Sequence, residues 1–411
     1  MSERVMNARS GPAVASDVVL RAEHVSVEYA GPRPTRAVRD VSFELRRGEV
    51  LGIAGESGSG KSTLAYALTR MLRPPAQLTS GSIEFVTRDG AAIDLMALDG
   101  DELRRFRWNK VSMVFQSAMN ALNPVTTLRK QFDDIFQAHS PEMDRGAREK
   151  RARELLDMVG IDPARVRGFA HELSGGMRQR VMIAMALALE PEIVIMDEPT
   201  TALDVVVQRE ILDEIERLRE EFGFSVIFIT HDLSLLLEVS DRLAVMYAGE
   251  IVEYALSEWV VSAPAHPYTL GLLRSFPDMR GARRELRGVP GSPPDLRDDF
   301  PGCPFEPRCE YAFAPCSAVH PALLPLVERT SGGFGGSSPQ ASTAGISGAT
   351  SEVGGWRAAC HLHSPEYRPK GPPDALSGAR EGRDREVAEV TSESAVGVER
   401  AVAADSAGGD Q

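Results

Sequence analysis

One short segment constrains the fold of this chain more than any other, the glycine-rich run GESGSGKS over residues 55–62. A short apolar run over residues 49–54 precedes it and predicts a strand, and residues 61–72 predict a helix. A glycine separated by four residues from Gly-Lys-Ser, between a strand and a helix, is typical of a phosphate-binding loop. The glycines let backbone amides converge on phosphate oxygens, and the helix N-terminus adds a favourable dipole. A glycine-rich turn without a ligand is the alternative.

Two side chains of this loop are expected to contact a nucleoside triphosphate and its metal ion. Lys61 would reach the β and γ phosphates, and the Ser62 hydroxyl would be a ligand of Mg²⁺. The other residues expected to bind the nucleotide here are Gly55, Ser57, Gly58, Gly60 and Thr63.

The rest of the first 255 residues alternates strand and helix signals. Residues 18–29 show stretches of alternation, and residues 193–196 and 224–229 are continuous apolar runs that fit strands of a parallel sheet covered on both faces. Apolar residues recur at helical spacing over residues 207–222. We therefore expect an α/β domain. Strand signals stop over residues 124–189, which predicts a helical insertion.

A pair of carboxylates ends the apolar run over residues 193–196. Asp197 is placed to hold Mg²⁺ directly or through water, as in other P-loop enzymes. Glu198 could polarise an attacking water. Taken alone, the pair could equally be two solvated acids at a strand end.

Composition excludes several classes of protein. The chain has 411 residues and a formal net charge of −13, which disfavours nucleic acid as the main ligand. Four cysteines are too few for a disulfide scaffold. No apolar run reaches the roughly 18 residues of a membrane-spanning helix, and the first 20 residues lack an apolar signal-peptide core. These observations predict a soluble intracellular protein.

Four further motifs occur in a fixed order with the loop and the acid pair. They are Gln116 in the sequence VFQ, the run LSGG over residues 173–176, the run TALD over residues 201–204, and His231 in THDL. In this order the motifs resemble those of an ATP-binding-cassette (ABC) ATPase. The resemblance covers about residues 18–255 and implies an ABC-type P-loop fold with a helical subdomain at about residues 124–189.

The resemblance implies a role for each motif in a head-to-tail dimer of two cassettes. ATP would lie between the Lys61 loop of one cassette and the Ser174-Gly175-Gly176 turn of the other, with Asp204 near the seam. His231 would contact the γ-phosphate and help order the attacking water and Glu198. Gln116 would be a ligand of Mg²⁺ and sense the γ-phosphate, and Tyr29 would stack on adenine.

The residues after the cassette resemble the C-terminal extension of the peptide/nickel importer subfamily. The matching runs are HPYT at 266–269, PGSPPDL at 290–296 and GCPFEPRC at 302–309. The extension would cover residues 256–364, including a Gly/Ser-rich loop at 331–355 that we expect to be flexible. Residues 1–17 are expected to be flexible and residues 365–411 a disordered tail.

All four cysteines fall in this extension, at Cys303, Cys309, Cys316 and Cys360. In a reducing cytosol two disulfides are improbable, and four thiolates suit either Zn²⁺ or an iron–sulfur cluster. Spacing does not choose between the two. The resemblance implies a 4Fe-4S cluster on these cysteines. Zinc, with His361 or His363 as a possible substitute ligand, and unliganded thiols are the alternatives.

The resemblance as a whole implies an ATP-hydrolysing subunit that powers import of short peptides from the cytoplasmic face of the cell membrane, as a peripheral protein. Its partners would be a second ATPase subunit (a non-identical paralogue or a second copy), two membrane permeases and, indirectly, an extracytoplasmic solute-binding protein. Import of nickel or another small solute is the alternative. A non-transport ABC ATPase and an inactive scaffold are weaker hypotheses, because the chain has one signature motif and every catalytic residue.

Overall fold

The computed structural model describes residues 17–115, 121–201, 203–275, 288–326, 356–368 and 371–377. Gln116, the expected Gly/Ser loop at 331–355 and all but Asp17 of the expected flexible N-terminus lie outside these ranges. Of the expected tail, the structure describes residues 365–368 and 371–377, which include the short helix α10 (Asp374–Ser377).

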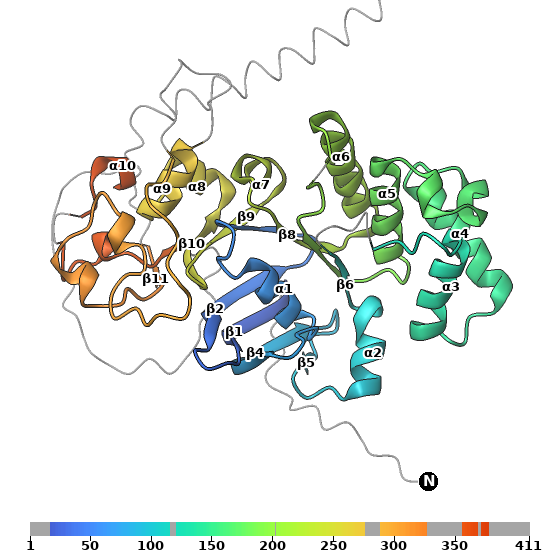
Figure 1. Ribbon diagram of the computed structural model, residues 1–411, viewed down its shortest axis with the longest axis horizontal. Helices are drawn as coiled ribbons and strands as arrows, with labels where there is room; N and C mark the ends of the chain where they lie inside the picture. Colours follow the sequence, from blue (N-terminus) through green and yellow to red (C-terminus); the bar gives the residue numbers. More distant parts are fainter. Residues whose placement is uncertain are drawn as a thin grey trace, which may run out of the picture.

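The described residues form two sheets that lie near the centre of the molecule in Figure 1. The smaller sheet is antiparallel with the order β2-β1-β4-β5. Its strands are β1 (Val18–Tyr29), β2 (Thr35–Arg46), β4 (Ala76–Val86) and β5 (Ala92–Asp94).

The larger sheet has the order β11-β12-β10-β9-β3-β8-β7-β6. The five strands from β9 to β6 run parallel, and the three from β10 to β11 are antiparallel. The strands are β3 (Val50–Ala54), β6 (Val111–Val114), β7 (Ile193–Asp197), β8 (Ser225–Ile229), β9 (Arg242–Tyr247), β10 (Glu250–Leu256), β11 (Leu324–Pro325) and β12 (Arg357–Ala358).

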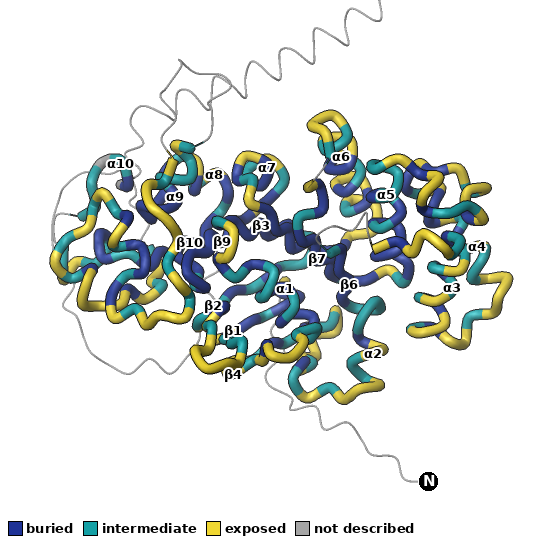
Figure 2. Tube along the Cα trace, viewed as in Figure 1, coloured by how far each residue is buried: buried dark blue, intermediate teal, exposed yellow. Residues whose placement is uncertain are grey.

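The parallel strands are buried on both faces, as their continuous apolar runs predict. Neighbouring residues of one strand enter different cores: Ile193 and Ile195 pack with the smaller sheet, whereas Val194 and Met196 pack with the helices on the other side. The dark tube through the centre of Figure 2 follows these strands. The expected α/β class is therefore confirmed.

Helices surround the larger sheet and gather at one end of the molecule in the helical insertion, at the right of Figure 1. The insertion contains α3 (Leu128–His139), α4 (Arg145–Met158), the 3-10 turns η2 (Pro163–Arg167) and η3 (Ala170–Glu172), and α5 (Gly175–Ala186). The other cassette helices are α1 (Lys61–Leu68), α2 (Gly100–Asn109), α6 (Val205–Phe222) and α7 (Leu233–Val239). Side chains cap α3, α4 and α6 at Thr127, Asp144 and Asp204, which satisfies amides that the first turn leaves free.

The cysteine-bearing extension occupies the opposite end of the molecule in Figure 1 and continues the larger sheet. Strand β12 pairs with β10, placing Ala358 opposite Glu253. The extension also contains α8 (Ser257–Ser262), α9 (Pro267–Arg274), η4 (Glu306–Arg308), η5 (Ala314–Ser317) and η6 (His361–His363). No helix within the described ranges is both long and apolar enough to cross a bilayer.

Buried Glu253 ties the extension to this sheet. Its carboxylate is fully buried and accepts hydrogen bonds from the amides of Ala265 and His266 at 2.8 and 2.9 Å and from the Trp356 indole at 3.2 Å. Burial raises the pKa of this carboxyl, and the donors oppose that shift. One side chain thus joins two segments of the extension, at residues 265–266 and at Trp356, to the cassette.

Candidate functional site

The candidate nucleotide site lies where parallel strands β3, β7 and β8 end. Since parallel strands align their carboxyl ends, the loops that follow residues 54, 197 and 229 meet at one edge of the sheet. The loop after β3 is the glycine-rich segment, the loop after β7 begins with Glu198, and the loop after β8 carries His231.

Two glycines of the loop are required by close backbone contacts. A Cβ at Gly55 would lie 2.3 Å from the Met246 carbonyl oxygen, and one at Gly60 would lie 2.1 Å from the Ala37 carbonyl oxygen. Both residues have positive φ values, of 150° and 101°. Ser57 and Gly58 are exposed between them, so the loop leaves its outer face open to a ligand.

Lys61, the first residue of α1, folds back into the loop. Its Nζ donates to the carbonyl oxygens of Gly55 and Glu56 at 2.8 and 2.9 Å and lies 3.4 Å from the Ser59 hydroxyl. The residue is 6 % exposed. Burial lowers the pKa of this ammonium, and the carboxylates of Glu198, Asp197 and Glu56 oppose the shift. The loop backbone therefore surrounds the Lys61 ammonium.

Ser62 and Asp197 form the expected Mg²⁺ pair. The Ser62 hydroxyl donates to Asp197 Oδ1 at 3.1 Å. Asp197 is 1 % exposed, and its Oδ2 has no hydrogen-bond partner among the described residues. Burial raises the pKa of this carboxyl, and the hydrogen bond from Ser62 opposes the rise. A buried carboxylate oxygen without a donor, beside a hydroxyl, fits a hard divalent cation. Gln116, the third expected ligand, lies outside the described residues.

Glu198 and His231 are in direct contact. His231 Nδ1 lies 2.9 and 3.0 Å from the two carboxylate oxygens of Glu198. Burial raises the pKa of Glu198, but the hydrogen bonds from Thr201 and His231 outweigh it, so the pKa lies below its usual value. The carboxylate therefore stays ionised at neutral pH and can accept a proton or polarise water. The backbone of Glu198 has a φ of +50°, a strained value that is common at functional sites.

Thr201 is a functional residue that the sequence analysis missed. Its hydroxyl donates to Glu198 Oε2 at 2.6 Å, the shortest contact of that carboxylate. A threonine three residues after a strand-end acid is a signal for a local side-chain turn. From the sequence, Thr201 was assigned only to the four-residue run TALD over residues 201–204.

Tyr29 lies beside the loop, at the end of β1. Its hydroxyl forms a 3.1 Å hydrogen bond with the hydroxyl of Thr63 on α1. The residue is half-buried. The structure thus brings both predicted nucleotide-binding residues together, on the side of the loop that faces the smaller sheet.

The signature turn over residues 174–176, and Asp204, lie at the starts of helices α5 and α6. Ser174 caps α5 by accepting a hydrogen bond from Met177, and Asp204 caps α6 by accepting one from Val207. A Cβ at Gly176 would lie 2.6 Å from Val207 Cγ1, so this glycine lets the two helices approach. No hydrogen bond joins Ser174, Gly175 or Asp204 to the glycine loop within the part of the chain that the structure describes.

The four cysteines come together in the extension. Cys303, Cys309, Cys316 and Cys360 line one pocket, and none is in a disulfide. Burial raises the pKa of Cys303 to about 12 and that of Cys309 to about 11, and it also raises the pKa of Cys360. Over the described ranges, no group of three or more His, Cys, Asp or Glu residues is arranged to hold a metal ion.

The two histidines of the zinc alternative are engaged elsewhere. His361 donates through Nε2 to the Val319 carbonyl at 2.7 Å, and His363 donates through Nε2 to the Ala265 carbonyl at 2.6 Å. Both bonds pack backbone segments of the extension together, so they support a structural role for the two rings.

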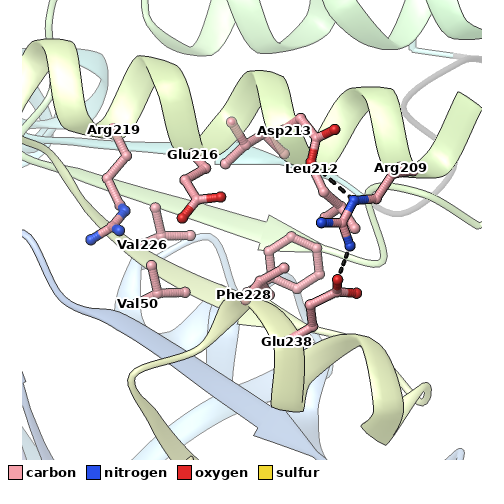
Figure 3. A pocket seen from close by; sticks show the side chains of 11 residues that line it. Val50, Arg209, Leu212, Asp213, Glu216, Arg219, Val226, Phe228 and Glu238 are labelled. Carbon is pink, nitrogen blue, oxygen red and sulfur yellow. Dashed lines mark ion pairs between the residues drawn. The ribbon is translucent and has the colours of Figure 1, made fainter. Parts of the chain in front are cut away.

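A separate pocket lies between α6, α7 and the strands β3 and β8 (Figure 3). Its floor is apolar, with Val50, Val226 and Phe228, and ion pairs of Arg209 with Asp213 and Glu238 close one side. None of the residues predicted to bind nucleotide lines it. The pocket therefore belongs to the helix–sheet packing and not to the nucleotide site.

Comparisons with known proteins agree with this fold and site. Residues 38–201 match the family described as ABC transporter, and residues 252–316 match the oligopeptide/dipeptide transporter C-terminal region. An ATP-binding cassette solved as a dimer bound to ADP and phosphate aligns with a TM-score of 0.51 and 30% identity, over 58% of this chain and 98% of that chain.

Two curated relatives extend the match into the extension. A putative peptide import ATP-binding protein of Brucella abortus is 44% identical over 71% of this chain and 89% of its own length. The dipeptide transport ATP-binding protein DppD of Bacillus subtilis is 44% identical over 72% of this chain and 88% of its own length. The fold and the site define an ABC-type ATPase. The chain belongs to the family of ABC transporter ATP-binding proteins.

Proposed function

We propose that this protein hydrolyses ATP to power the import of short peptides through separate membrane permease subunits. The observation that carries the proposal is one chain that joins an ABC transporter cassette to an oligopeptide/dipeptide transporter C-terminal region. The relatives that share both parts are named as peptide and dipeptide transport proteins. Nickel or another small solute is the competing cargo.

The site geometry supports a hydrolytic step with the following roles. The Lys61 ammonium donates to the loop carbonyls. When ATP binds, the ammonium would donate to oxygens of the β and γ phosphates instead. Asp197 and Ser62 would hold Mg²⁺, which neutralises charge on the phosphates when bound. Glu198, ionised and aimed by Thr201 and His231, would polarise the attacking water. Positioning and charge dominate phosphoryl transfer, so these residues account for the chemistry.

Within the described residues Ser174 and Asp204 cap their own helices and form no hydrogen bond with the glycine loop, which supports action as a dimer. We propose that the Ser174–Gly176 turn and Asp204 complete the ATP site of a second cassette, which is a paralogue or another copy of this chain. Tyr29 would stack on adenine, and His231 would also contact the γ-phosphate. Gln116 would report nucleotide state to the permease. The complex would sit on the cytoplasmic face of the membrane, with solute delivered by an extracytoplasmic binding protein.

We also propose that Cys303, Cys309, Cys316 and Cys360 hold a 4Fe-4S cluster. Four thiols that line one pocket supply the number of thiolates that such a cluster needs, and zinc is the competing occupant. When bound, the cluster would cross-link the segments of the extension. Anaerobic purification followed by iron and sulfide analysis tests this, with Cys303→Ser as the comparison. Stoichiometric zinc without iron would overturn it.

Capture of the tagged chain from membranes of the native cell tests the transport proposal. We expect the chain to co-purify with membrane permeases. Proteoliposomes that contain this complex should import a labelled short peptide only when ATP is present. Import of nickel in place of the peptide would show that the transported solute is nickel and would overturn the peptide assignment. Co-purification with ribosomes or DNA would contradict the transport role.

A further inference from the structure

The extension makes a direct ion pair with the nucleotide loop. Arg308 donates through its two terminal nitrogens to the two carboxylate oxygens of Glu56, at 2.7 and 2.9 Å, across 252 residues of sequence. The Arg308 side chain is 5 % exposed and that of Glu56 is 26 % exposed. Paired, planar contacts of this kind are the strongest geometry available to arginine and carboxylate.

Residues of the extension, together with Tyr247 at the end of β9, fix the position of Arg308. The guanidinium also donates to the Pro290 carbonyl at 2.6 Å and to the Tyr247 hydroxyl at 3.2 Å. It lies over the ring of Phe305, 5.9 Å from the centroid. Arg308 precedes Cys309 directly in the sequence, so the cysteine segment sets where this cation lies.

A second contact reaches the same loop residue. The amide of Glu56 donates to the hydroxyl of Tyr268 at 2.9 Å, and Tyr268, on α9, is fully buried. The carbonyl of Glu56 receives Lys61 Nζ at 2.9 Å. The extension therefore holds Glu56 by its backbone and its side chain, while the same residue holds the lysine that is expected to meet the phosphates.

The charge of Glu56 makes this pairing consequential. The loop binds a polyanion, and a carboxylate at its second position would repel the phosphates unless a cation neutralised it. Arg308 supplies that cation from the buried side, where solvent screening is weak.

We propose that Arg308 is a positioning residue of the ATP site: it cancels the Glu56 charge and, with Tyr268, holds the loop around Lys61. The cysteine-bearing extension is then a structural part of the nucleotide site. The inference rests on ATP binding by this chain and is independent of the transported solute.

ATP affinity of the full-length chain tests this proposal, measured with a fluorescent ATP analogue and compared with KM and kcat. Arg308→Ala should weaken ATP binding about tenfold or more, with kcat at saturating ATP within about threefold of wild type. Glu56→Gln alone should not weaken ATP binding, because the carboxylate that it removes would repel the phosphates. The double variant Glu56→Gln/Arg308→Ala should recover most of the lost affinity. Arg274→Ala is the matched control, since it removes an exposed ion pair with Glu310 in the same extension.

Two results overturn the proposal: wild-type affinity in Arg308→Ala, or a double variant that binds ATP no better than Arg308→Ala. If Arg308→Ala fails to fold, Arg308→Lys and Arg308→Gln replace it. The lysine variant should then bind ATP more tightly than the glutamine variant, and equal affinities contradict the proposal. A wild-type chain that binds no ATP would instead refute the proposed function.

Discussion

Replacement of Glu198 by glutamine is the sharpest single change at the site. The carboxylate accepts hydrogen bonds from Thr201 at 2.6 Å and from His231 at 2.9 and 3.0 Å. Glutamine keeps one accepting oxygen and puts an NH₂ group where the second oxygen was, so one hydrogen-bond acceptor and the negative charge are lost. The water would lose its proton acceptor while Lys61 and Asp197 stay in place.

The expected size follows from the usual contribution of a general base, about 10² to 10⁴ in rate. That corresponds to about 2.7–5.5 kcal/mol of transition-state stabilisation. We expect kcat to fall by at least about a hundredfold and ATP affinity to stay within about threefold of wild type. Because binding persists without turnover, ATP should trap a dimer.

Phosphate release measures the rate, and size-exclusion chromatography with ATP detects the dimer. Glu220→Gln serves as the control, because Glu220 is an exposed carboxylate on α6, away from the catalytic carboxylate. Near-normal hydrolysis by Glu198→Gln would refute the assignment of Glu198.

Three further predictions address the site and its supports. Thr201→Val removes a hydrogen bond that lowers the pKa of Glu198, so the acidic limb of the kcat–pH profile should move to higher pH, whereas Thr201→Ser should leave it in place; an unmoved limb in the valine variant would contradict the role of Thr201. Gly60→Ala should abolish nucleotide binding in a titration, because its Cβ would meet the Ala37 carbonyl at 2.1 Å; wild-type affinity would refute this. Glu253→Ala leaves the buried amides of Ala265 and His266 without an acceptor, so it should lower the free energy of unfolding by on the order of 3 kcal/mol in denaturant unfolding. An unchanged denaturation midpoint would contradict the anchoring role of Glu253.

Local sequence patterns predicted the cassette well because they carry the strand and loop signals. Strand β1 spans Val18–Tyr29, the bounds that the alternating pattern predicted, and β7 extends the predicted run by one residue to Asp197. The predicted helix over residues 61–72 was wrong at its end. It stops at Leu68, and Arg70 adopts a positive φ of 51°.

Contacts between distant segments were beyond sequence reasoning. Nothing in the spacing of Glu56 and Arg308 indicates that they pair across 252 residues, because tertiary packing of the extension decides it. The antiparallel pairing of β12 with β10 is equally non-local. The cysteines were grouped by their position in the extension and by the family resemblance, and their convergence on one pocket agrees with that grouping.

The central claim is that ATP hydrolysis at this site drives peptide import. Import of a labelled short peptide into proteoliposomes that contain the captured complex and its binding protein tests it most directly. The account predicts ATP-dependent uptake that Glu198→Gln abolishes while the complex stays assembled. Peptide uptake that persists in that variant, or ATP hydrolysis with no peptide uptake, would contradict it.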